Sequence, residues 1–193
     1  MMFMSGFTDA FSEATDDQEN WEYQISAFPS GLENITSWAE DNTSAFELTL
    51  VAQASIAGTT KAIDLKGNDV LSEQDDALHR LNLLEGNLPD SGQSPVQGIL
   101  DEGSSELESY AIGDVITIDF EGEQHDIEVV GIARELSRSI YMHRSDVQPI
   151  VGKEANGALL VTTPGADIED IRFSTISIVE KETMVATFEE LID

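Results

Sequence analysis

Three histidines are the first residues to consider for chemistry, because imidazole serves as a metal ligand and as a general base near neutral pH. His79, His125 and His143 are scattered, and none has a second histidine at the spacing of a zinc motif. The chain has no cysteine that could complete a zinc site or act as a nucleophile. We interpret the histidines as single surface residues and predict no metal site. His125, between charged residues, suits a solvated strand face.

Motifs for covalent or nucleotide chemistry are missing from the sequence. A serine nucleophile is expected in G-x-S-x-G or S-x-x-K, and neither pattern occurs. The phosphate loop G-x-x-x-x-G-K-[ST] and the dinucleotide pattern G-x-G-x-x-G are also absent. We therefore predict that this segment binds no nucleotide or other cofactor, and we assign it no catalytic residues.

Acidic side chains dominate the polar residues, with 38 Asp and Glu against 9 Lys and Arg, for a net charge of −29. Neighbouring carboxylates could bind calcium, but the EF-hand pattern is absent and solvated acids are the simpler interpretation. The pairs considered are Asp16 with Asp17, Asp75 with Asp76, and Asp167 with Asp170. A protein this acidic is a poor partner for nucleic acid, which is bound through clustered Lys and Arg.

A basic group of residues lies between positions 134 and 144. It has two interpretations, a strip that receives an acidic partner or anion, or charges that offset acids nearby in the sequence, and we favour the second. The residues concerned are Arg134, Arg138, His143 and Arg144, with Glu135 and Asp146 as the nearby acids.

Hydrophobic residues make up 40% of the chain, enough for a core, and no apolar run approaches the roughly 20 residues that cross a bilayer. Apolar periodicity predicts helices near both ends and a β-rich middle. The helices are expected at 4–15, at 30–42 with Ser30 and Glu33 as a capping box, and at the end around Val185 and Leu191.

The β-rich middle is expected to contain two strands within 46–66 around Gly58, after a first strand at 21–28. Residues 71–86 are expected to form a short helix or turn. The clearest unit is a hairpin, because residues 115–120 alternate, Glu121 and Gly122 make a turn, and residues 125–133 return. The remaining expectations are strands at 96–100 and 174–180 and a short helix at 104–110. Residues 139–152 are expected to form a strand that runs into a turn or short helix, and residues 157–165 a buried strand with a Pro-Gly turn.

The order of pieces across residues 44–152 resembles a known family. A strand pair with a glycine turn is followed by Gly86-Asn87-Leu88-Pro89, then by Ile112-Gly113-Asp114 at the start of a strand, and then by Val129-Val130-Gly131-Ile132. A tyrosine-containing strand, IYMHRSDVQPIVG, comes next. This order is similar to the extracytoplasmic core domain of ABC transporter permeases of the FtsX-like, MacB-like and LolC-like type. The sequence departs from the family pattern at His143, where a proline is common.

The resemblance implies an α+β fold in which a mixed α/β lobe is built from both chain ends, at about 1–58 and 153–193, and a β-rich lobe, at about 59–152, is inserted between them. It implies a non-catalytic domain on the extracytoplasmic side of the cell membrane, tethered by membrane spans in the full-length protein. An ATP-binding subunit would drive motion that reaches an extracellular protein, lipid or lipoprotein outside.

Two other functions stay open at this stage. One is a free-standing halophilic extracellular binding module, which predicts no flanking membrane spans. The other is a halophilic enzyme whose site assembles only in the fold, around His79 or His125. Sequence leaves the transported substrate and the oligomeric state undetermined.

The acid excess generates the first testable prediction. Acids are spread along the whole chain and only four lysines are present, which favours adaptation to molar salt over a local acidic interaction surface. Self-repulsion destabilises a compact state at this charge, whereas about 1 M salt shortens the Debye length to about 3 Å. We expect circular dichroism to show loss of structure between about 2 M and about 20 mM salt. An unchanged spectrum over that range would contradict the prediction.

Overall fold

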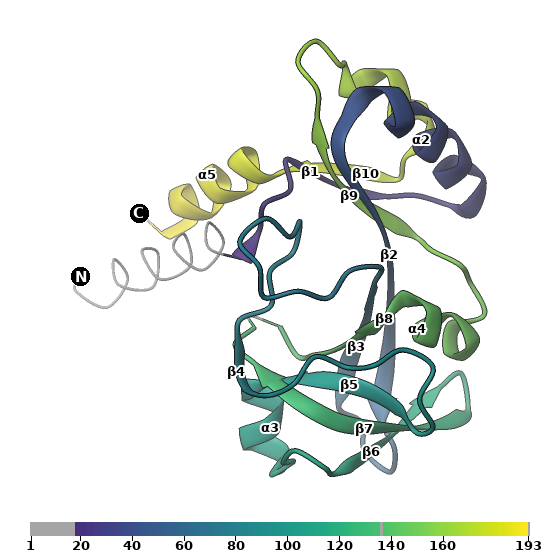
Figure 1. The fold of residues 1–193 in the computed structure, drawn as a ribbon, viewed down its shortest axis with the longest axis vertical. Helices are drawn as coiled ribbons and strands as arrows, with labels where there is room; N and C mark the ends of the chain where they lie inside the picture. Colours follow the sequence, from purple (N-terminus) through teal and green to yellow (C-terminus); the bar gives the residue numbers. More distant parts are fainter. Residues whose placement is uncertain (1–17, 136, 193) are drawn as a thin grey trace. The chain divides into compact units, whose positions relative to one another are not determined.

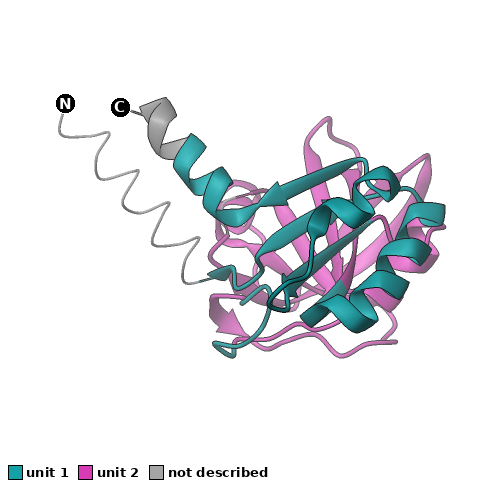
Figure 2. Ribbon diagram, turned by 90° about the horizontal axis from the view of Figure 1, so that it is seen from above, with its two compact units in different colours: residues 1–47, 74–80, 157–193 teal, residues 48–73, 81–156 magenta. Residues whose placement is uncertain are grey.

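The computed structural model describes residues 18–135 and 137–192, and the side chains up to residue 187. It is a mixed α/β structure, which confirms the expected fold class (Figure 1). Contacts divide the chain into two compact units (Figure 2). Unit 1 comprises Met1–Glu47, Gln74–Arg80 and Gly157–Asp193, and unit 2 comprises Leu48–Glu73 and Leu81–Asn156. The helix expected at 4–15 lies outside the described residues.

Unit 1 contains a sheet whose strands come from both ends of the chain. Its order is β10-β1-β9-β2, and β1 pairs antiparallel with both β10 and β9. Tyr23 in β1 lies opposite Glu180 on one side and Leu160 on the other. The strand bounds are β1 Tyr23–Ser26, β2 Thr43–Ile56, β9 Gly157–Thr162 and β10 Ser177–Glu180, and only the first part of β2 belongs to this unit.

Among the described residues of unit 1, three helical segments accompany this sheet: α2 (Pro29–Asn42), the 3-10 helix η1 (Ile168–Ser174) and α5 (Lys181–Ile192). The helix expected at 30–42 is present, but its predicted capping box is wrong. Pro29, whose ring fixes a helical φ, occupies the first turn, so α2 begins after Phe28 without a side-chain cap. η1 was not expected from the sequence.

The core of unit 1 includes a segment from the middle of the chain. Leu78 packs with Trp21 and Leu159, and Met184 contacts the same cluster. The Asn20 side chain donates to the carbonyls of Asp75 at 2.7 Å and Ala77 at 2.8 Å. These bonds attach residues 74–80 to unit 1, in which they form turns rather than a helix.

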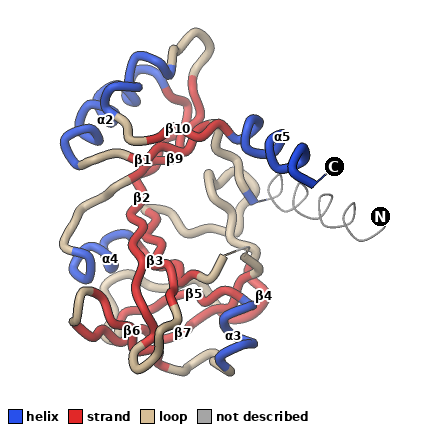
Figure 3. The backbone as a smooth tube through the Cα atoms, turned by 180° about the vertical axis from the view of Figure 1, so that it is seen from behind, coloured by secondary structure: helices blue, strands red, loops and turns tan. Residues whose placement is uncertain are grey.

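Unit 2 is built from the remaining strands, which Figure 3 shows together with α3 and α4. The order is β2-β3-β8-β5-β7-β4, and β6 pairs with β2 and β7. α4 contacts β3 and β8. The bounds are β3 Ala62–Asn68, β4 Leu83–Gly86, β5 Val96–Asp101, β6 Val115–Phe120, β7 Glu123–Ala133, β8 Ser139–His143, α3 Glu102–Glu108 and α4 Arg144–Val151.

The hairpin predicted from alternation is present as β6 and β7. Ile116 lies opposite Ile127, and both are fully buried in the core of unit 2. The turn residues Glu121 and Gly122 have φ of 53° and 90°, as a two-residue hairpin turn of the primed type requires. The Asp119 carboxylate accepts a bond from the Gly122 N–H at 3.0 Å.

A close approach between α2 and η1 generates a stability prediction. A Cβ at Gly31 would lie 2.0 Å from the Ser174 carbonyl oxygen, so the two segments touch only because residue 31 has no side chain. Gly31→Ala normally favours a helix, yet we expect it to destabilise the protein by about 1–3 kcal/mol, because the backbone must shift. Denaturant unfolding in high salt measures this.

The neighbouring Ser30→Ala change is the control, since Ser30 is exposed and precedes the contact. We expect it to change stability by less than about 0.5 kcal/mol. A stabilising Gly31→Ala would show that the α2–η1 contact is wrongly described.

Candidate functional site

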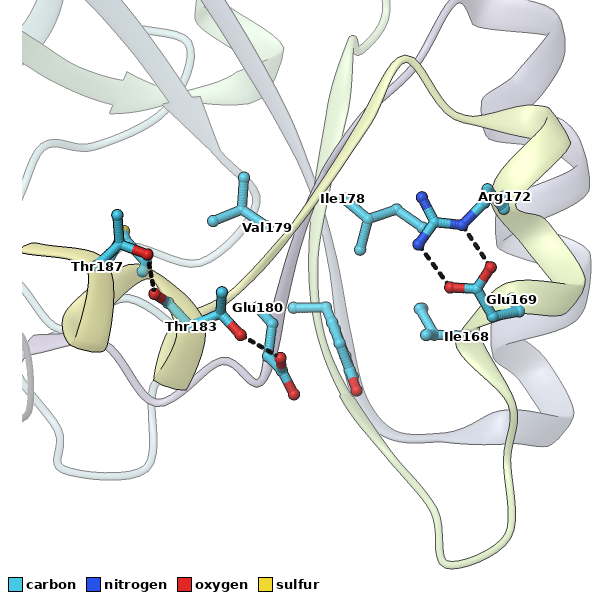
Figure 4. Close-up of a pocket in the computed structure, with 10 residues that line it drawn as sticks. Ile168, Glu169, Arg172, Ile178, Val179, Glu180, Thr183 and Thr187 are labelled. Atoms are coloured by element: carbon cyan, nitrogen blue, oxygen red, sulfur yellow. Dashed lines mark hydrogen bonds and ion pairs between the residues drawn. The ribbon is translucent and has the colours of Figure 1, made fainter.

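The main candidate site is a hollow of about 690 Å³ in unit 1, a size typical of ligand and peptide sites. Four elements form it: β10 along its length, η1 on one side, α5 on the other, and β1 through Tyr23 (Figure 4). Its lining is mostly apolar, with polar groups at intervals. The lining residues are Tyr23, Ile168, Glu169, Arg172, Ile178, Val179, Glu180, Thr183, Met184 and Thr187.

The hollow follows the edge of β10 rather than one face of the sheet. Consecutive side chains of a strand point to opposite faces, yet Ile178, Val179 and Glu180 all line it. Val179 joins the core cluster of Trp21, whereas Ile178 lies opposite buried Ile25. Figure 4 shows Ile178 directed toward η1 and Val179 toward α5. The hollow therefore extends around the strand edge onto both faces.

The one basic side chain in this lining is already neutralised. Arg172 binds Glu169 through two parallel bonds, of which the Nη2–Oε1 bond is 2.5 Å. This guanidinium holds the pKa of the Glu169 carboxyl below its ordinary value. Arg172 thus offers little positive charge to a ligand.

The rest of the hollow has a negative potential. The Tyr23 pKa is raised from 10.0, first by burial and then by the carboxylates of Glu22, Glu180 and Glu182. Of these three, Glu180 lines the main hollow, and all three line an adjoining hollow of about 330 Å³ in the same unit. The site therefore favours neutral or positively charged groups over anions.

Another hollow, of about 480 Å³, lies in unit 2, and His125 is part of its lining. The expectation of a solvated His125 is wrong, because its side chain is half-buried and its Nε2 is enclosed. Pro95, Val115 and Ile150 surround it, since the β6–β7 hairpin faces the loop before β5 and the end of α4. Asp126 is also there, with its Oδ1 accepting from the Thr117 hydroxyl at 2.7 Å.

The other two histidines occupy structural positions. His79 is buried, and its Nδ1 lies 2.9 Å from Glu19 Oε1, so the surface assignment from sequence is wrong. The pair links residues 74–80 to the strand region before β1. His143 is half-buried at the end of β8, and its Nε2 lies 3.0 Å from the Pro89 carbonyl oxygen. Neither lines the main hollow.

Each arginine of the basic group has a carboxylate partner distant in sequence. Arg134 lies 3.6 Å from Glu102, Arg138 lies 3.1 Å from Glu108, and Arg144 lies 2.7 Å from Asp69. The favoured interpretation, that acids offset these charges, is right. The acids in these three pairs, however, are not Glu135 and Asp146, which the sequence suggested. Asp146 instead accepts a bond from the Gly92 N–H at 2.9 Å.

Two acids from the pairs considered in the sequence make local contacts in the described part of the chain. Asp75 lies 2.9 Å from Arg80, and Asp167 accepts the Glu169 N–H at the start of η1. Asp16 and Asp17 lie outside the described residues. Within the described part of the chain, no three His, Asp or Glu side chains are grouped to hold a metal ion. None of the described helices is both long and apolar enough to cross a membrane.

Tyr23 provides a spectroscopic test of the site. Its raised pKa has burial as the largest cause and nearby carboxylates as the next, so it should ionise above pH 10.0. The difference between alkaline ultraviolet titrations of the protein and of Tyr23→Phe isolates this phenol. Glu180→Gln should lower the Tyr23 pKa only part of the way, because burial persists. Ionisation at or below 10.0 would contradict the described environment.

No model of a protein family matches the sequence, and no curated protein matches it. Solved structures do match. The periplasmic region of MacB from Actinobacillus actinomycetemcomitans aligns with a TM-score of 0.57 at 13% identity, over 90% of this chain and 94% of that chain. The extracellular domain of the noncanonic ABC-type transporter YknZ from Gram-positive bacteria aligns with a TM-score of 0.53 at 14% identity, over 88% and 94%. The resemblance read from the sequence is thus confirmed at the level of structure: this chain has the fold of the extracytoplasmic domains of MacB and YknZ.

Proposed function

We propose that this chain is the extracytoplasmic domain of an ABC transporter permease, located outside the membrane and tethered to it in the full-length protein. The observation that carries the proposal is the extent of the structural match, which covers 90% of this chain and 94% of the MacB periplasmic region. A match over nearly the whole of both chains favours a shared role for the complete domain over a shared supersecondary motif. The fold alone does not identify a substrate.

The placement of the chain ends supports the same proposal. Lys181, the first residue of α5, donates from its ammonium group to the Glu19 carbonyl at 2.9 Å. The start of the described chain therefore lies beside the beginning of α5, its last element. A domain inserted between two membrane helices needs this arrangement, because those helices must leave it side by side.

In this proposal the domain is non-catalytic, and a separate ATP-binding subunit supplies the energy. ATP-driven motion passes through the membrane part to the domain and then to an extracellular protein, lipid or lipoprotein. The absence of phosphate-binding motifs in the sequence agrees with this division of labour. The lobe limits expected from sequence, 1–58 with 153–193 and 59–152, stay a prediction for dissection experiments.

The test is to read the source gene on both sides of this segment. We expect an apolar span of about 20 residues before residue 1 and further spans soon after residue 193. A gene for an ATPase should be adjacent or fused. A cleavable signal before Met1 with a stop codon after Asp193 would contradict the proposal, and a free-standing binding module would then replace it.

A further inference from the structure

We propose that the hollow along β10 is a docking groove for an extended, lysine- or arginine-containing segment of a partner protein, which adds to the sheet of unit 1 as a further strand. The binding mode is inferred from the geometry of this chain. The location of the partner outside the cytoplasm is inferred from the proposed function.

The position of β10 in the sheet provides the backbone groups for such binding. β10 is the last strand of its order, and among the described strands it pairs only with β1. In an antiparallel ladder, alternate residues bond to a given neighbour, so the others direct their N–H and C=O groups away from it. These groups of β10 face the side on which the hollow lies. Strand addition is an established way for such an edge to bind a peptide.

The shape of the hollow suits a strand better than a compact ligand. It contacts three consecutive residues of β10 and therefore spans both faces of the sheet at its edge. An added strand does the same, because its own side chains alternate between the two faces. Side chains on one face would contact Ile168 and Ile178, and those on the other would contact Val179 and Met184. The four residues of β10 would pair with about four residues of a partner.

The charge at the groove distinguishes three possible occupants: a second copy of the chain, its first 17 residues, and a segment of another protein. Glu180 lines the groove, and Glu22 and Glu182 line the adjoining hollow. Together with Asp167 they raise the pKa of Tyr23 in the groove lining, so the charge at the groove is negative. A second copy of the chain would bring another −29 charges to the same edge. The first 17 residues contain four acids and no Lys or Arg, so their charge is no better matched. A basic segment of another protein is the occupant that complements the site.

An alternative explanation is that the edge of β10 is protected against pairing with other strands. β10 is short, and it carries Glu180 at its end. Protection alone, however, does not require an apolar hollow of about 690 Å³ with walls on both faces. The two explanations differ in one measurable respect: a protected edge rejects a basic extended peptide, whereas a docking groove binds it through backbone bonds.

The experiment measures binding of the chain to a labelled octapeptide of alternating lysine and valine, by fluorescence anisotropy over the range of salt concentrations in which circular dichroism shows the chain to be folded. The decisive control is the same peptide N-methylated at alternate residues on one edge, which removes N–H donors and keeps charge and side chains. We expect saturable binding by the parent peptide and at least about tenfold weaker binding by the methylated one at each salt concentration. Rising salt should weaken binding of both.

Two pairs of protein variants locate the site. Thr187→Trp adds bulk to the groove wall, whereas Ala186→Trp adds it to the next exposed position, outside the lining. Glu180→Gln and Glu121→Gln both change the net charge by one, but only Glu180 lines the groove. We expect Thr187→Trp to weaken binding by about tenfold or more, and Glu180→Gln to weaken it more than Glu121→Gln does. Circular dichroism checks that each variant is folded.

Several results would overturn the proposal. These are no binding of the parent peptide, equal binding of the two peptides, or equal effects within either pair of variants. Self-association of the chain that Thr187→Trp abolishes would identify a second copy as the occupant, and the basic-partner assignment would be wrong. The proposed function is tested separately by the flanking gene sequence, so its failure and the failure of this groove are distinguishable.

Discussion

The register of β2 is the constraint on which both units depend. This strand of 14 residues starts in unit 1 beside β9 and continues in unit 2, where it pairs with β3 and β6. A slip of one residue would turn Leu50, Ala54 and Ile56 away from the core of unit 2 and would shift the ladder of unit 1 with them. Asn156 fixes the register, because its side chain donates to the Val51 carbonyl at 2.6 Å and accepts from the Val51 N–H at 2.9 Å.

The second constraint is electrostatic. With 9 basic residues against 38 acidic ones, most of the basic side chains contact a specific carboxylate, carbonyl or hydroxyl group, often distant in sequence. Lys61, before β3, and Arg138, before β8, both contact Glu108 at the end of α3, at 2.6 and 3.1 Å. Exposed pairs of this kind contribute little stability each. In unit 1, Glu169 likewise pairs with Arg172, the one basic side chain of the groove lining, so the unpaired charge of that lining is negative.

Local patterns predicted the elements that depend on local physics. The β6–β7 hairpin follows from alternation and from a turn in which Gly122 tolerates positive φ. The patterns failed where tertiary contact decides: η1 is held against α2 through the close approach at Gly31, and His79 is buried by its contact with Glu19. The groove was not predictable, because Tyr23, Arg172 and Ile178 come from three segments that only the β1–β10 ladder brings together. A single signal was available, the amphipathic strand at 174–180, but nothing in it shows that one edge is left without a neighbour.

The walls of the groove connect it to the proposed function in a mechanical sense. One wall is η1, which is fixed to α2 because Gly31 lies directly against Ser174. The other wall is α5, which follows β10 without an intervening loop. If α5 continues into a membrane span, as the proposed function requires, then movement of that span reaches Thr183 and Thr187 before any other part of the groove. The spacing between a fixed wall and a movable one would then depend on the state of the transporter, and with it the affinity for a bound strand. A groove at this edge is therefore placed where motion in the membrane could be converted into capture or release of a partner.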